Sequence, residues 1–261
     1  MSKPTEYLMP KELVALVEKA KPSLHLLRLF HGCYAFVDSQ KHLSVGVIAT
    51  TGLRGCSVAC SDIAAIAGSP GGKSNAWVEA AIDAGDWRHL FSHLSLDTTG
   101  RDLTFKFAPK VGNAWLRQKA DPFAMLDSEE VRKISSANEV LFYTQAAMVH
   151  RAEQPMFNLP FICPISQPWN DDTKKTWLRI AVRVGQKLGQ DYVFIPKRDP
   201  LNRLVVAVVV KVVTSSSLWS PGALFPRPPC PPVSVVHDSG FSSLRKAELI
   251  ARRNWTRATG S

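Results

Sequence analysis

The sequence predicts a mixed α/β chain of the α+β kind, built from two helix-and-hairpin modules. Three observations support this prediction: apolar residues recur at helical spacing in several segments, two alternating hairpins each follow a helix, and turn residues separate these elements. The chain has 261 residues, 45% of them apolar, which is enough to bury the core of one large or two small domains.

The first sixty residues contain one predicted helix and one predicted strand. Residues 10–21 have apolar side chains at helical spacing, and Pro10 suits a first helical turn. Residues 42–49 have the composition of a strand, and Gly52 and Gly55 mark a turn after it. We therefore expect a helix and then a strand before the more strongly patterned region.

Two short helices are predicted next. Ser61 is placed to cap the first, and residues 68–72 form a turn because three of these five residues are glycine. Ser74 or Asn75 is placed to cap the second helix, and Gly85 lies just past its end. The segment therefore predicts helix, turn and helix in close succession.

A hairpin follows these helices. Apolar and polar residues alternate over residues 94–96 and 103–107, and residues 97–100 supply the turn between the two strands. Helix, turn, helix and hairpin is the order of a winged helix, in which the second helix enters a groove of DNA. We therefore predict a winged-helix-like module over residues 1–120.

A connecting segment is predicted over residues 121–168. Asp127 with Glu130, and Ser136 with Glu139, have the spacing of capping boxes, and the second opens a helix over residues 137–152. Four prolines then favour an extended connector. They are Pro155, Pro160, Pro164 and Pro168.

The second module is predicted over residues 169–213. Residues 171–188 form an amphipathic helix that Gly189 terminates, and strands at 192–196 and 203–213 flank a turn at 197–200. The apolar stripe of the helix is Trp177, Ile180, Ala181, Val184 and Leu188. This order again predicts a winged-helix-like module. Residues 214–261 are expected to be a proline-rich linker followed by a basic tail.

Positive charge is concentrated in two segments of the chain. The formal net charge is +10, of which residues 170–211 carry +5 and residues 241–261 carry +4. Basic residues recur every four positions along the 171–188 helix, and others follow in the adjoining turn. Because a clustered charge of this kind favours a polyanionic partner, we predict nucleic-acid contacts here. The predicted binding residues are Lys174, Lys175, Arg179, Arg183, Lys187, Lys197, Arg198 and Arg203.

Other predicted contacts lie in the first module and the tail. The candidate groove helix of the first module has Lys73 and Asn75 at its start, and Arg101 lies at the hairpin turn. Glu79 and Asp83 on that helix oppose tight docking, so this module is expected to dimerise or to contact DNA weakly. Arg252 and Arg253 are predicted contacts in the tail.

Residues 67–74 also fit a relaxed phosphate-loop pattern, in which Lys73 and Ser74 would meet phosphate and Mg²⁺. The preceding residues 62–67 have a helical composition, whereas the motif requires a strand. A turn between two helices is therefore the favoured interpretation, and a phosphate-loop nucleotide-binding protein stays open as an alternative.

Metal and cofactor chemistry is not predicted. The five cysteines are scattered, and Cys56 and Cys60 have no second pair at zinc spacing. The seven histidines and the acid pairs show no catalytic spacing. Free thiols fit a reducing cytoplasm, and no apolar run is long enough to span a membrane. We therefore expect a cytoplasmic, non-enzymatic protein without metal or cofactor.

The order of elements over residues 60–213 resembles the plasmid replication initiators of the Rep type. Residues 94–107 (LSLDTTGRDLTFKF) are similar to the wing of such proteins, and residues 126–134 (LDSEEVRKI) with residues 139–143 (EVLFY) are similar to their connecting helix. The resemblance implies tandem winged helices, repeated-site DNA binding, a monomer–dimer switch and contacts with host replication proteins. Only the basic residues of the second module carry over as binding residues.

The predicted function is sequence-specific binding of double-stranded DNA, as a replication initiator or a related regulator. RNA binding as a ribonucleoprotein subunit stays open, because a basic helix and tail serve RNA equally well. An adaptor that docks an acidic protein through the same basic stripe is a third alternative. A homodimer and other protein partners are compatible with the sequence, and a membrane partner is not expected.

Overall fold

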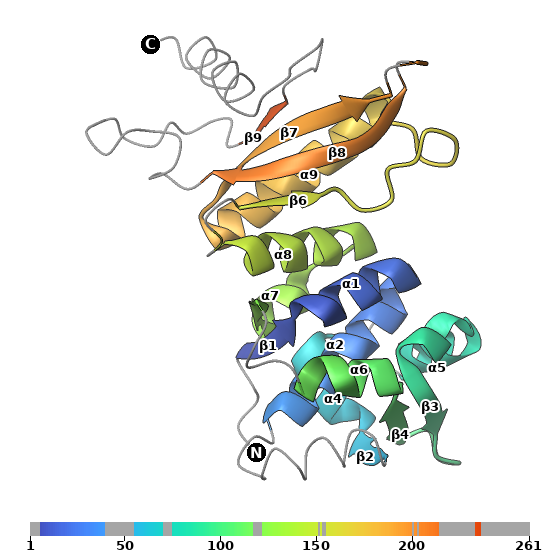
Figure 1. The fold of residues 1–261 in the computed structure, drawn as a ribbon. Coiled ribbons are helices and arrows are strands. Elements are labelled where there is room, and N and C mark those ends of the chain that lie inside the picture. The colour runs from blue at the N-terminus through green and yellow to red at the C-terminus, as the bar shows by residue number, and fades with distance from the viewer. Residues whose placement is uncertain are drawn as a thin grey trace. The chain divides into compact units, whose positions relative to one another are not determined.

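The computed structural model describes residues 6–39, 55–69, 75–116, 122–150, 152, 155–199, 201–202, 204–213 and 233–235. The chain divides into two compact units, Met1–Thr144 and Gln145–Ser261. Both units combine helices with small sheets whose strands are mostly antiparallel (Figure 1). The predicted α+β class is confirmed.

Unit 1 consists of helices around two small sheets. Its helices are α1 (Lys11–Ala20), α2 (Leu24–Ser39), α4 (Cys60–Ala67), α5 (Ala76–Asp83), α6 (Pro109–Leu116), α7 (Ser128–Lys133) and the start of α8 (Ala137–Val149), with a 3₁₀ turn η1 (Asp86–His89). Its strands are β1 (Glu6–Pro10), β2 (Cys56–Ala59), β3 (Phe91–Leu96), β4 (Asp102–Phe107) and β5 (Phe123–Asp127).

The predicted hairpin of unit 1 is confirmed. Strands β3 and β4 pair antiparallel, and β2 joins the other edge of β4, giving the strand order β2-β4-β3. Asp97 builds the turn, because its Oδ1 accepts hydrogen bonds from the amides of Arg101 (2.8 Å) and Asp102 (2.9 Å). The elements follow in the order α2, β2, α4, α5, β3 and β4, so the two short helices and the hairpin succeed one another as predicted.

The core of unit 1 is an aromatic cluster between α2 and the hairpin. Phe30, Phe91, Phe105 and Phe107 are buried, and their neighbouring ring centroids lie 5.2–6.1 Å apart. A Cβ at Gly32 would lie 2.7 Å from Ile63 Cγ2, so α2 and α4 approach closely at this glycine. Helix α2 was not predicted, because burial on nearly all sides leaves it without an amphipathic stripe.

Buried polar groups join α2 to its neighbours. The Tyr7 hydroxyl lies 2.6 Å from His31 Nδ1, and the Asp38 carboxylate accepts a hydrogen bond from the amide of Leu8 (3.1 Å). Both contacts fasten β1 to α2. Burial lowers the pKa of His31 to about 3, so this imidazole is neutral in the folded protein. The Arg28 guanidinium donates to the carbonyl of Ile134, which joins α2 to the end of α7.

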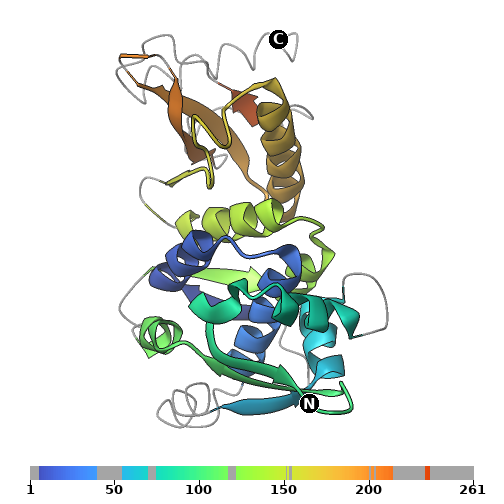
Figure 2. The same cartoon turned by 90° about the vertical axis from the view of Figure 1, so that its right-hand side faces the viewer.

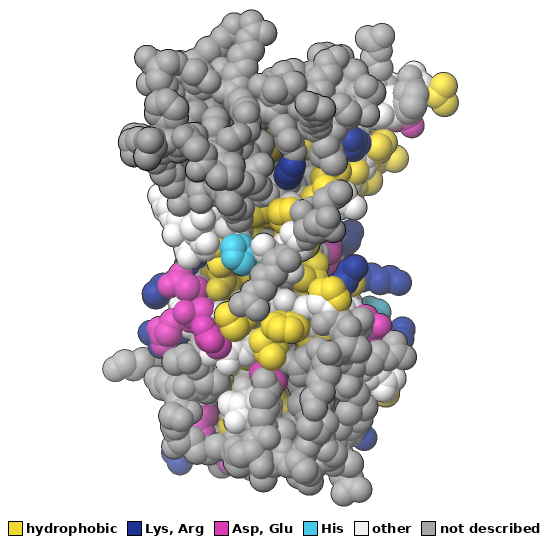
Figure 3. Space-filling model, turned by 60° about the vertical axis from the view of Figure 1, so that its left-hand side comes forward, with side chains coloured by type: hydrophobic (Ala, Val, Ile, Leu, Met, Phe, Trp, Pro, Cys, Tyr) yellow, Lys and Arg dark blue, Asp and Glu magenta, His cyan; other side chains and the backbone are white. Residues whose placement is uncertain are grey.

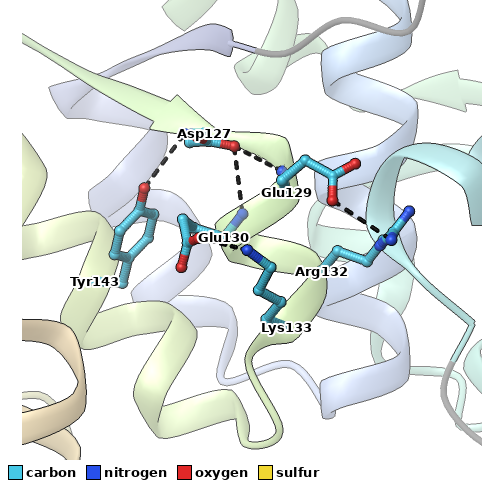
Figure 4. Close-up of polar contacts among 6 residues, drawn as sticks. All are labelled: Asp127, Glu129, Glu130, Arg132, Lys133 and Tyr143. Carbon is cyan, nitrogen blue, oxygen red and sulfur yellow. Dashed lines mark hydrogen bonds and ion pairs between the residues drawn. The ribbon is translucent and has the colours of Figure 1, made fainter. Parts of the chain in front are cut away.

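Strand β5 pairs with β1 and leads into a capped helix, α7 (Figure 4). Asp127 Oδ1 accepts hydrogen bonds from the amides of Glu129 (2.7 Å) and Glu130 (3.3 Å), as the capping spacing predicted. The amide of Asp127 donates to the Tyr143 hydroxyl at 3.3 Å. Two ion pairs run along α7, Arg132–Glu129 and Lys133–Glu130. This cap fixes the short connection between β5 and α8.

Unit 2 places one long helix on a four-stranded sheet. Its elements are β6 (Met156–Asn158), α9 (Asp171–Leu188), β7 (Asp191–Arg198), β8 (Val205–Val213) and β9 (Val233–Val235). The strand order is β6-β8-β7-β9, and Figures 1 and 2 show α9 lying along one face of the sheet. The β6-β8-β7 part is antiparallel, whereas β9 pairs parallel to β7. The helix and the hairpin of the second module are confirmed.

Several details differ from the sequence predictions. Ala59 is the N-cap of α4 and no side chain caps the helix, so the predicted cap by Ser61 is wrong. The helix predicted over residues 137–152 ends at Val149. Strand β7 runs on to Arg198, so Lys197 and Arg198 belong to the strand and not to the predicted turn. The strand predicted over residues 42–49 lies outside the described residues.

Some elements were not predicted at all. Strands β6 and β9 fall in segments interpreted as connector and linker, and each is a three-residue strand that exists through pairing with β8 or β7. Helix α6, with eight residues, was also not predicted, and strands β1, β2 and β5 have only four or five residues each. Such elements carry too few residues to show a period, and they depend on partners distant in the chain.

Candidate nucleic-acid interface

Helix α9 is fixed at both ends and along one side. Asn170 Oδ1 accepts a hydrogen bond from the amide of Thr173 (2.9 Å) and caps the start. Gly189 has φ +65°, a left-handed conformation that ends the helix as predicted. The predicted stripe packs inward, with Trp177, Ile180, Ala181 and Val184 buried and Leu188 half-buried. The opposite side of α9 is therefore held in a fixed orientation.

The exposed side of α9 carries cations on successive turns. Lys175, Arg179 and Arg183 are exposed, and we call these three residues the basic face. Arg183 lies eight positions after Lys175, a rise of about 12 Å along the helix axis. A helix with its side chains is about 10–12 Å across, which fits the width of roughly 12 Å of a DNA major groove. Lys174 and Lys187 are half-buried at the margins of this face. Three of the four residues of the predicted stripe are thus exposed, and the fourth, Lys187, is half-buried.

Acidic residues occupy only the start of α9. Asp171 and Asp172 lie in its first turn, where the helix dipole favours negative charge, and the remainder of the helix sequence contains none. The next acid along the chain, Asp191, begins β7 and is half-buried. Arg179, at the centre of the basic face, is two turns away from Asp171.

The hairpin of unit 2 extends the positive charge. Lys197 and Arg198 are exposed at the end of β7 and pair with Ala207 and Val205 of β8. Asp199 closes the turn, because its amide donates to the carbonyl of Leu204 (2.8 Å). The two cations therefore project from a paired strand, which restrains them more than the predicted turn would.

A buried network that the sequence did not reveal joins α9 to β7. Gln190, which is 1% exposed, accepts a hydrogen bond from the Tyr192 hydroxyl at 2.9 Å, and its Nε2 lies 2.7 Å from His150 Nδ1. A Cβ at Gly185 would lie 2.5 Å from the Gln190 carbonyl oxygen. These contacts pack the end of α9 closely against the start of β7. A glycine inside the helical pattern was the one available signal.

The candidate residues of unit 1 lie in a different environment. Asn75 is the N-cap of α5, and its Nδ2 donates to the carbonyl of Gly100 (2.6 Å), which ties the helix start to the hairpin turn. Arg101 is exposed beside that turn, and Glu79 and Asp83 are exposed on α5. The two acids that the sequence places on this helix are therefore exposed to solvent.

Four predicted binding residues lie outside the described part of the chain. They are Lys73, Arg203, Arg252 and Arg253.

Among the described residues, little supports a metal site, a reactive thiol or a phosphate loop. Within them, no group of three or more metal-ligating side chains comes together, and no helix is long and apolar enough to cross a membrane. Burial raises the pKa of Cys60 to about 11, which keeps this thiol protonated. Helix α4, and not a strand, precedes the phosphate-loop-like segment, so the context that this motif requires is missing.

The order of elements also has a counterpart among solved structures. No family model matches the chain, and a search of curated proteins gives no match. The crystal structure of Pi initiator protein in complex with iteron DNA has a similar fold, with a TM-score of 0.53 and 13% sequence identity. The similarity covers 82% of this chain and 99% of that chain. The resemblance to replication initiators is therefore confirmed at the level of the fold.

Proposed function

We propose that this protein binds double-stranded DNA without catalysing a reaction, with the basic face of α9 in the major groove. The observation that carries the proposal is the exposure of Lys175, Arg179 and Arg183 on successive turns of a helix whose other side is buried. A helix of this form fits the major groove, and its cations meet phosphates and base edges.

The arrangement of unit 2 supports this docking. Strands β6, β8 and β7 form the small antiparallel sheet behind α9, as in a winged helix whose recognition helix is exposed in front. The similar fold belongs to an initiator protein crystallised with iteron DNA. We propose that this chain likewise acts as an initiator or a related regulator that recognises a particular DNA sequence.

The roles within the basic face follow from position. Arg179 lies midway between Lys175 and Arg183, so it comes closest to the groove floor, where a guanidinium can bind guanine with two hydrogen bonds. Lys175 and Arg183 lie nearer the groove walls and would contact phosphates. Lys197 and Arg198 would reach the neighbouring backbone.

The test compares two double variants on duplexes selected from a random library. R179A/R183A is expected to bind at least 30-fold more weakly, since each lost contact costs about 1–3 kcal/mol. The control K11A/K19A removes the same charge from exposed positions of α1 and is expected to bind like the wild type. Equal losses in the two variants would remove α9 as the binding element.

A competition separates DNA from RNA. Single-stranded RNA and unrelated duplex are expected to displace the selected duplex only at concentrations well above its own. Displacement by RNA at equal concentration would overturn the assignment to duplex DNA.

A further inference from the structure

The end of the β7–β8 hairpin in unit 2 presents apolar side chains to solvent. Leu201 is 95% exposed and Leu204 is 49% exposed, and Val206 nearby on β8 is 44% exposed. We call Leu201, Asn202 and Leu204 the hairpin tip. Figure 3 shows hydrophobic side chains protruding at this end of the unit. Three exposed apolar residues within six positions are more than the scattered single residues usual on protein surfaces.

Side chains of Asp199 and Asn202 accept hydrogen bonds from backbone amides of the hairpin tip. Asp199 Oδ1 accepts hydrogen bonds from the amides of Leu201 (2.7 Å) and Asn202 (3.3 Å). Asn202 Oδ1 in turn accepts from the amide of Leu204 at 2.9 Å. Side-chain bonds of this kind stabilise turns, so the backbone at Leu201 is restrained while its side chain faces solvent.

The tip also projects beyond the start of α9. Trp169, just before the helix, stacks on Phe194 of β7 with ring centroids 6.1 Å apart and an interplanar angle of 15°. From Phe194 the strand continues for four more residues to Arg198, about 13 Å further. This reach is comparable with the separation of roughly 17 Å between neighbouring grooves, half of a helical turn of DNA.

Charge around the tip favours a polyanion over a protein partner. Lys197 and Arg198 are exposed directly before it, while the carboxylate of Asp199 accepts hydrogen bonds from the amides of the tip. An apolar point flanked by cations complements a DNA groove, where phosphates form the walls and base faces lie between them.

We propose that Leu201 is a wedge that enters the minor groove next to the major groove occupied by α9, partly unstacks one base step and bends the duplex. The inference rests on the proposed function and adds to it a shape-dependent component of recognition. Flexible steps such as TA or CA are then favoured under the tip, at positions that no hydrogen bond reads.

The experiment measures bending of a selected duplex of about 30 base pairs that carries a donor and an acceptor dye at its ends. Wild-type protein is expected to shorten the end-to-end distance and to raise the fluorescence of a 2-aminopurine placed under the tip. The variant L201S is expected to lose both signals and to bind about tenfold more weakly, with the salt dependence of binding unchanged.

The matched control is I165S, because Ile165 is 93% exposed in the same unit but lies on another loop. This variant is expected to bend DNA like the wild type. Bending by L201S at the wild-type level overturns the wedge and leaves the proposed function intact, as does an effect of L201S on self-association alone. If the wild type binds no duplex, the proposed function and the wedge fail together.

Discussion

The two units of this protein share a sheet connectivity and differ in the helix that precedes the hairpin. In the hairpin sheet of each unit, the strand that precedes the hairpin in the chain pairs with the second hairpin strand, giving β2-β4-β3 in unit 1 and β6-β8-β7 in unit 2. Helix α5 of unit 1 has eight residues and exposes Glu79 and Asp83, whereas α9 has eighteen and exposes Lys175, Arg179 and Arg183.

The difference shows that the order of elements does not by itself assign a binding role. The scaffold orients a helix face, and the residues on that face decide whether a polyanion is attracted or repelled. Our proposal therefore puts DNA docking in unit 2. Substitutions in each unit test whether the two units divide their roles in this way.

The largest effects are expected from replacing a glycine in each unit at which the backbone lies very close to a neighbouring segment. G185V forces side-chain atoms against the Gln190 carbonyl, and G32V forces them against Ile63, so each is expected to destabilise its own unit by about 3 kcal/mol. Hydrogen exchange measured peptide by peptide shows which unit has lost stability. Only G185V is expected to weaken duplex binding, and an equal loss in G32V would contradict the division of roles.

A smaller effect concerns acid sensitivity of unit 1. Burial lowers the pKa of His31 to about 3 in the folded state, against about 6.5 when unfolded. The unfolded chain therefore binds the proton more readily, and the stabilisation present above pH 6.5 is lost as the pH falls towards 3. Between pH 7.5 and 5 the loss is about 2 kcal/mol.

Urea unfolding of the wild type and of H31Q at pH 7.5 and pH 5 measures the contribution of His31 to the free energy of unfolding. H31Q is expected to be less stable at pH 7.5 and to lose about 2 kcal/mol less on acidification. Hydrogen exchange is expected to show this difference only in peptides of unit 1. The same acid dependence in both proteins would show that His31 is not the group responsible.

The smallest effects come from two helix caps, one in each unit. N170A removes the cap of α9 and D127A removes the cap of α7, and each is expected to cost about 1 kcal/mol in its own unit. N170A is also expected to weaken duplex binding severalfold, because fraying of the first turn disturbs the approach to Lys175. D127A serves as the matched control, and an identical binding loss there would count against the account.

Sequence patterns predicted the elements whose own residues carry a strong period. Helix α9 matched from Asp171 to Leu188 because its apolar and basic residues occupy separate sides, and Asp127 was identified as a cap from its spacing to Glu130. Helix α2 lacks such a contrast, since even Arg28 and His31 are buried. A period is informative only when one side of an element faces water.

For the candidate site, too, the sequence predicted the helix-borne residues and missed the tertiary contacts. Four-residue spacing was sufficient to bring Lys175, Arg179 and Arg183 to one side of a helix. The contact of Gln190 with His150 joins residues forty positions apart, and no local pattern encodes it. The projection of the hairpin tip depends on the stack of Trp169 on Phe194, which is likewise a tertiary feature.

The most direct measurement is the dependence of duplex affinity on salt concentration. Each phosphate contact releases counterions and adds roughly 0.9 to the slope of log K against log salt concentration. The wild type is expected to show a slope of about −4 or steeper, and R179A/R183A is expected to lower its magnitude by about 1 to 2 while K11A/K19A leaves it unchanged. A slope that is the same in all three proteins would contradict the placement of the basic face of α9 on DNA.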